Sequence, residues 1–188
     1  SEMCIRDSPI LLHARDDQSP EIYSFIQGTV GIYSAKKITE ERENQDSAGI
    51  IQLTKDKSLL IVADGMGGHR GAAEASKLAV MNIVQSTKNY NEKEDSLQAL
   101  ILQGFEKANK AVRDMGVGAG TTLLVAEINS KYIRFYSCGD SSGMLFGGKG
   151  HLKYRTVEQS VTGYAIESTT LEEKEALEHP QRNILIYS

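Results

Sequence analysis

Short apolar or alternating stretches predict β-strands in the first third of the chain and again after residue 120. Stretches rich in Val, Ile, Tyr and Thr and bounded by glycine or polar turns are typical of strands. The continuous apolar run over residues 59–63 predicts a well buried strand. The expected strands cover residues 23–33 (one strand or two), 47–53, 59–63, 121–128, 132–137, 144–146 and 152–156.

Between and after these strands, other patterns predict helices. Apolar residues at positions 72, 75, 79 and 83 predict an amphipathic helix over residues 70–87. The same spacing predicts a second helix over residues 97–112, with Gly116 as a stop. Thr170 and Glu173 form a capping box, which predicts a short helix that ends around His179. Because the helices are segregated from the hairpins, the expected fold class is α+β.

Length, composition and charge narrow the classes of protein. A chain of 188 residues with 40% apolar residues fits one globular domain. The formal net charge is −4, from 21 basic and 25 acidic residues, and there is no dense Lys/Arg block. We therefore expect no nucleic-acid partner and no membrane partner, while a small-molecule or protein substrate stays open.

The first residues have no pattern of a folded element. Residues 11–22 are polar, so we expect residues 1–22 to be a flexible leader or scar and the ordered domain to cover residues 23–188. The first ten residues lack the basic start and apolar stretch of a signal peptide. Cys4 and Cys138 cannot form a disulfide framework, which suits a reducing compartment. The expected location is the cytoplasm.

Asp64 carries the strongest chemical signal, because it ends the apolar run and is followed at once by a glycine-rich segment, GMGGHRG. A carboxylate at the end of a strand has a fixed direction, and glycine lets main-chain oxygens approach a cation. The alternative interpretation is a glycine-rich turn whose aspartate caps the following helix. An isolated Asp-Gly would favour that alternative.

Two further acids stand at strand edges. Asp46 precedes an expected strand, close to Arg42, and Asp140 follows another. Each acid taken alone is more often a turn residue, and Arg42 is equally well a solvated surface charge. Three acids together favour a metal site, and oxygen ligands without a Cys or His cluster indicate Mg²⁺ or Mn²⁺ rather than zinc.

Four ordered motifs resemble one family, the metal-dependent Ser/Thr protein phosphatases of the 2C (PPM) type. The motifs are ENQDS at 43–47, VADGMGGHRGAAEAS at 62–76, AGTTLLVAEI at 119–128 and YSCGDSSGMLF at 136–146. Weaker matches follow at 158–160 and 175–185. The Met after Asp-Gly resembles the bacterial branch of the family.

The resemblance implies a fold, a reaction and a set of roles. The fold would be an antiparallel β-sandwich flanked by helices, with residues 23–188 as the N-terminal portion of a catalytic domain. Asp64 would bridge two divalent ions, the carbonyl of Gly65 would bind one of them, and Asp46 would bind or orient metal-bound water. Asp140 resembles the ligand of an additional, weaker ion. The reaction would be hydrolysis of phosphoserine and phosphothreonine esters in a phosphoprotein by a metal-bridging water.

Three departures from the family pattern limit what the resemblance implies. The phosphate-binding Arg of the family is expected where Glu41 stands, so Arg42 is only a candidate. Ser142 stands where the family commonly has Arg. The chain ends at Ser188, before the last metal-binding carboxylates of the family. We therefore expect residues 1–188 alone to bind metal weakly, to turn over slowly and to expose edges and apolar faces.

Rival functions can be weighed from the same residues. A dinucleotide fingerprint needs a glycine where Arg70 stands, and a phosphate loop needs a Gly-Lys-Ser/Thr ending, which is missing. A cysteine phosphatase would need an Arg shortly after its catalytic cysteine. At that position after Cys138 this chain has Met144. The remaining alternative is a pseudophosphatase, a binding module that keeps the fold without catalysis.

Overall fold

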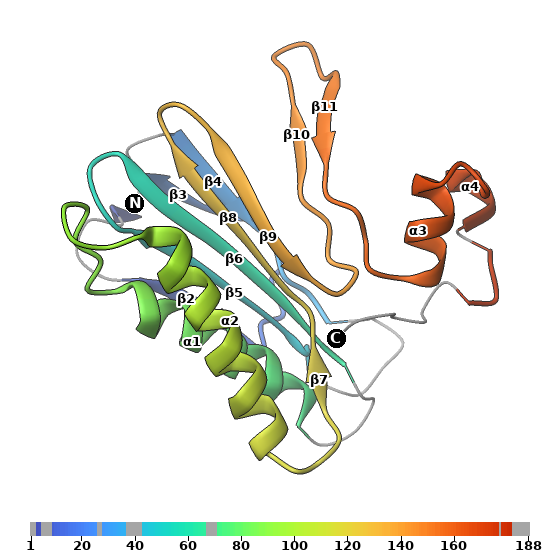
Figure 1. Cartoon of the computed structure of the whole chain (residues 1–188), viewed down its shortest axis with the longest axis horizontal. Coiled ribbons are helices and arrows are strands. Elements are labelled where there is room, and N and C mark those ends of the chain that lie inside the picture. The colour runs from blue at the N-terminus through green and yellow to red at the C-terminus, as the bar shows by residue number, and fades with distance from the viewer. Residues whose placement is uncertain are drawn as a thin grey trace.

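An antiparallel sheet is the centre of the fold (Figure 1). The computed structural model describes residues 3–4, 9–25, 28–36, 43–66, 71–176 and 178–181. Within them the strands are β1 (Met3–Cys4), β2 (Ile10–His13), β3 (Glu21–Phe25), β4 (Gly28–Ile32), β5 (Asp46–Gln52), β6 (Lys57–Met66), β7 (Gly120–Thr121), β8 (Leu123–Asn129), β9 (Ile133–Cys138), β10 (Met144–Phe146) and β11 (Leu152–Arg155). The helices are α1 (Ala72–Thr87), α2 (Leu97–Asp114), α3 (Val161–Glu167) and α4 (Glu173–Ala176).

The central sheet has the strand order β2-β5-β6-β8-β9, and β7 pairs with the end of β6. The helices α1 and α2 cover one face of this sheet (Figure 1). On that face Leu59 and Ile61 of β6 pack with Val125 of β8, Ile83 of α1 and Ile101 of α2, and all five are at most 1% exposed. Each such side chain contributes roughly 1.5–3 kcal/mol to folding when it leaves water.

The other face of the central sheet is covered in part. The strands β3 and β4 pack there through Tyr23 and Val30, which lie against Ile50 of β5. Beyond that contact Val62 of β6 is 43% exposed. The continuous apolar run over 59–63 predicted a well buried strand, but the described residues cover this face only near β3 and β4.

The hairpin of β10 and β11 forms a sheet of its own beside β9 (Figure 1). The ring of Tyr154 in β11 stacks on that of Phe135 in β9, with centroids 5.8 Å apart. Met144, Phe146 and Leu152 of the hairpin are each 45% exposed or more. The exposed apolar faces expected from the sequence are therefore present.

Three elements differ from the sequence expectations. Met3 and Cys4 fall in the expected leader, yet they form β1, which pairs with β3. Residues 10–13 fall in the expected leader, yet they form β2, in which His13 pairs with Ser47 of β5. The expectation of a leader over residues 1–22 is therefore wrong at β1 and β2, because both strands pair with segments that are distant in the sequence. The helix α3 was not predicted. It begins after Ser160, whose hydroxyl accepts a hydrogen bond from the amide of Gly163.

The remaining expectations agree closely with the structure. The helices expected over 70–87 and 97–112 correspond to α1 and α2, and the short helix expected after Thr170 corresponds to α4, which begins at residue 173. Among the described residues, no helix is both long enough and apolar enough to cross a membrane.

The contact between α1 and α2 predicts one sensitive position. A Cβ on Gly104 of α2 would lie 2.6 Å from Ser86 Oγ and 2.8 Å from Ile83 Cδ1 of α1. Gly104→Val should therefore separate the helices and lower the free energy of unfolding by about 1–3 kcal/mol, measured by urea denaturation. Gly148→Val is the control, since a Cβ there meets no atom within 4 Å. Equal stability of the two variants would contradict this packing.

Candidate metal site at the ends of β5 and β6

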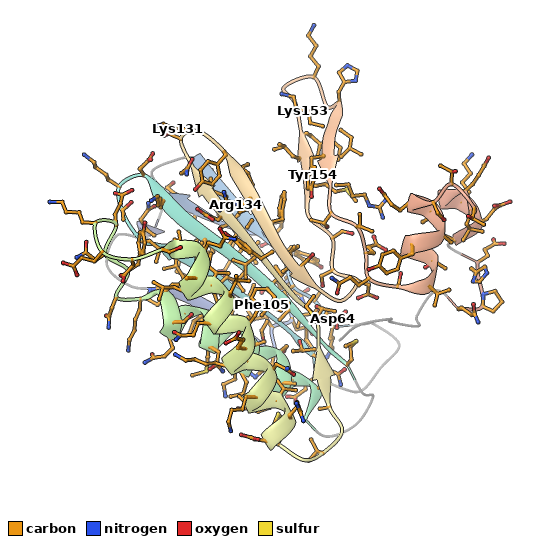
Figure 2. All side chains as sticks on the ribbon, in the orientation of Figure 1. Asp64, Phe105, Lys131, Arg134, Lys153 and Tyr154 are labelled. Atoms are coloured by element: carbon orange, nitrogen blue, oxygen red, sulfur yellow. The ribbon has the colours of Figure 1, made fainter. Side chains whose placement is uncertain are left out.

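Asp46 and Asp64 lie directly opposite each other in the antiparallel pair of β5 and β6. Side chains alternate between the two faces of a strand, so both carboxylates share the face of Val62 and point away from α1 and α2. The two carboxyl groups lie close enough for each to affect the ionisation of the other. Asp64 lies at the β7 end of the sheet, opposite the turn that carries Lys131 (Figure 2).

This proximity changes the ionisation of both acids. Partial desolvation, followed by the charges of Asp46 and Asp140, raises the pKa of Asp64 to about 6. Desolvation also raises the pKa of Asp46. Ionisation of both adjacent carboxyl groups is unfavourable without a compensating charge. A divalent cation supplies that charge, and carboxylate oxygens are the ligands that Mg²⁺ and Mn²⁺ prefer.

Neighbouring groups fix the direction of each acid. The amide of Asp46 donates to the Oδ1 of Asn44 over 2.9 Å, and the Nδ2 of Asn44 donates to the carbonyl of Arg15 and the hydroxyl of Ser34. Asn44 is only 6% exposed. The amide of Asp64 donates to the Oγ1 of Thr122 over 2.9 Å. The main-chain amides of Asp46 and Asp64 are therefore each bound by a residue that lies outside β5 and β6.

Gly65 occupies a position that has no room for a side chain. Its amide donates to the carbonyl of Gln45 over 3.1 Å. A Cβ built on Gly65 would lie 2.1 Å from the carbonyl oxygen of Ala72, at the start of α1. The glycine thus lets β5, β6 and α1 meet beside Asp64. Whether its carbonyl binds an ion stays a prediction.

The other candidate residues are placed less completely. Asp140 lies in the turn after β9, near enough for its charge to act on Asp64. Arg42 lies outside the described residues, so its role as a phosphate ligand stays a prediction. Within the described ranges, no three or more His, Cys, Asp or Glu side chains form a group that could hold a metal ion. The described candidate metal ligands are therefore the pair of Asp46 and Asp64, with Asp140 as a more distant third acid.

A groove of about 400 Å³ leads away from the pair, between β4 on one side and β5 and β6 on the other. Ser34 and Ser141 line it together with Asp46 and Asp64. Ser142, next to Ser141, donates to the carboxylate of Glu158 over 2.7 Å, so it faces the segment that follows β11. The acids therefore stand at an opening that a ligand can reach.

Sequence reasoning missed two of the residues that hold the site. Asn44 had a usable signal, since an Asn commonly accepts a hydrogen bond from the amide two residues on. Thr122 had none, because its partner Asp64 lies 58 positions away in the sequence.

Comparison with known proteins decides the family. The sequence profile described as protein phosphatase 2C matches residues 35–186. The chain belongs to the protein phosphatase 2C family. A serine/threonine phosphatase, stp, of Listeria welshimeri is 27% identical over 151 residues, which cover 76% of this chain and 60% of that protein. PhpP of Streptococcus pneumoniae is 29% identical over 152 residues, or 77% of this chain and 61% of that protein.

Solved structures of protein phosphatases confirm the expected α+β sandwich fold. The phosphatase PstP/Ppp of Mycobacterium tuberculosis matches with a TM-score of 0.65 at 25% identity, over 82% of this chain and 64% of that chain. Stp1 of Staphylococcus aureus matches with a TM-score of 0.70 at 21% identity, over 100% of this chain and 67% of that chain. The chain spans about 60% of the length of the curated relatives it matches.

The raised pKa of Asp64 predicts how stability depends on pH without metal. Its folded pKa of about 6 exceeds the ordinary value of 3.8, so ionisation of this carboxyl disfavours the folded state. The contribution is favourable below the ordinary value and is lost as pH rises through the folded pKa. Asp64→Asn should therefore raise the unfolding temperature in EDTA at about pH 7.5, and this difference should vanish at about pH 4.

The control for this experiment is Asp114→Asn. Asp114 is exposed and forms an ion pair with Lys110 on the surface of α2, so its removal should change stability little at either pH. A loss of stability for Asp64→Asn at the higher pH would contradict the repulsion between the two acids. The measurement is thermal unfolding followed by circular dichroism.

The close packing around Gly65 predicts a second effect. Gly65→Ala places a methyl group against the main chain of Ala72, which cannot rotate away, so β6 or α1 must shift. The free energy of unfolding should fall by about 1–3 kcal/mol. Gly120→Ala is the control in the paired strand β7, because its Cβ would lie 3.5 Å from Met66 Cε. Similar stability of both variants would contradict this geometry.

Proposed function

We propose that this protein hydrolyses phosphoserine and phosphothreonine esters in phosphoproteins with the help of divalent cations. The observation that carries the proposal is the pairing of Asp46 with Asp64 across β5 and β6 at the mouth of a groove. Membership of the protein phosphatase 2C family supports the reaction, and relatives named serine/threonine phosphatase support the substrate class. The cytoplasmic location expected from the sequence is part of this proposal.

The residues of the site would divide the work. Asp64 would contribute to both cations, Asp46 to the same pair, and the Gly65 carbonyl to one of them, with Asp140 available to a third. Bound Mg²⁺ or Mn²⁺ would supply a water nucleophile at neutral pH and neutralise the charge of the phosphate. A solved PstP catalytic domain contains two manganese ions; its TM-score against this chain is 0.60 at 22% identity. Arg42 remains the candidate for the substrate phosphate.

The rival proposal is a pseudophosphatase that binds a phosphoprotein without turnover. The carboxylate pair opposes it, because a partly buried acid whose pKa is raised by burial and by a neighbouring carboxylate is unfavourable for a fold that holds no cation. Perturbed acids of this kind cluster at functional sites. The two proposals differ in whether a bound phosphopeptide releases phosphate.

Phosphate release from phosphothreonine and phosphoserine peptides tests the proposal. We expect slow release that needs Mn²⁺ or Mg²⁺ and stops in EDTA, because Asp46 and Asp64 leave much of the coordination of a cation to water. Asp64→Asn and Asp46→Asn should each lower the metal-dependent rate at least about a hundredfold. Asp114→Asn, at the exposed end of α2, should keep the wild-type rate.

Two outcomes would contradict the proposal. Phosphopeptide binding with Mn²⁺ present but no phosphate release above background would favour the pseudophosphatase. Release that is unchanged by Asp64→Asn or by EDTA would show that the carboxylate pair does not carry the reaction. Mn²⁺ binding, measured by the loss of the electron paramagnetic resonance signal of free Mn²⁺, reports the metal site independently of turnover.

A further inference from the structure

Thr122 lies between the two acidic segments of the site. It is the residue between β7 and β8, and it is fully buried. Its Oγ1 accepts a hydrogen bond from the amide of Asp64 over 2.9 Å, and its own amide donates to the carbonyl of Asp64 over 2.9 Å. Thr122 therefore holds the main chain of Asp64 at both its amide and its carbonyl group.

The same hydroxyl also contacts the turn that carries Asp140. The Oγ1 of Thr122 lies 2.7 Å from the Oγ of Ser141. Gly139 packs against the other side of Thr122, where an added Cβ would lie 2.8 Å from the Cγ2 of Thr122. Gly139 has a φ of +96°, which a side chain rarely adopts, so the turn approaches Thr122 closely only with glycine there.

A hydroxyl has one proton and two lone pairs. In Thr122 one lone pair accepts the hydrogen bond from the Asp64 amide. The hydroxyl of Ser141 bonds to either the proton or the other lone pair. One buried atom thus connects the backbone of Asp64 with the segment that carries Asp140.

We propose that Thr122 is a positioning residue whose hydroxyl sets the separation between Asp64 and the Asp140 turn, and thereby the affinity of the site for divalent cations. This inference rests on the proposed function of the carboxylate pair. In this proposal Thr122 is not itself a ligand of the cation or the substrate. It acts through the two acidic segments that it connects, as outer groups around metal ligands do elsewhere.

The test compares three variants of the full chain. Thr122→Val keeps the shape and deletes the hydroxyl, whereas Thr122→Ser keeps the hydroxyl and deletes the methyl group. Thr87→Val is the matched control, because Thr87 is also fully buried but donates to the carbonyl of Ile83 in α1 over 2.8 Å. Thr87→Val therefore deletes one buried hydroxyl away from the acids.

The first measurement is amide hydrogen exchange by NMR, without metal. Thr122→Val should speed the exchange of the Asp64 amide at least about tenfold and shift the resonances of residues 139–141. Thr122→Ser should keep the wild-type exchange at Asp64, and Thr87→Val should leave both segments unchanged. An Asp64 amide that exchanges equally in the Val variant and the wild type would overturn the inference, whether or not the chain binds metal.

The second measurement is Mn²⁺ affinity by electron paramagnetic resonance. Thr122→Val should weaken binding about tenfold or more, as loss of an outer hydrogen bond around a metal site typically does. Thr122→Ser should restore affinity to within about threefold of wild type, and Thr87→Val should match wild type. Equal losses in Thr122→Val and Thr87→Val would show only general destabilisation and would overturn the inference. Wild-type protein without Mn²⁺ binding would instead contradict the proposed function, and amide exchange would still decide the role of Thr122.

Discussion

The antiparallel pairing of β5 with β6 is the contact on which the rest of the structure depends. Its register sets Asp46 opposite Asp64 and turns both away from the helices. A slip of one residue would turn every side chain of one strand to the other face. Asp64 would then face α1, and its place at the groove would go to Ala63 or Gly65. The candidate site is therefore a direct consequence of this register.

The helix side of the sheet stabilises that register. Leu59 and Ile61 alternate with Val62 and Asp64 along β6, and the first two are buried against α1 and α2. Burial of apolar groups on one face offsets the repulsion that the two acids create on the other. A divalent cation between the acids would remove the repulsion, so metal binding and folding are expected to be coupled.

Much of the secondary structure was predictable because its signals are local. The strands and helices expected from periodicity match β5, β6, α1, α2 and the later hairpins within a few residues. The strand β2 was missed, since only Leu12 in it is buried and its partner β5 is distant in sequence. The helix α3 was missed because its seven residues, VTGYAIE, contain a glycine and complete less than two turns of apolar spacing.

The sequence by itself determined which acids are candidates for the metal site, because an aspartate at a strand end beside glycine is a local pattern, and it determined the family through its motifs. Only the tertiary structure decided how those acids are held. Asn44 and Thr122 each bind the main chain of one acid, and the partners of Thr122 lie 58 and 19 positions away. Side-chain periodicity reports which face a residue occupies, whereas the separation of two carboxylates depends on register and on buried hydrogen bonds between distant segments.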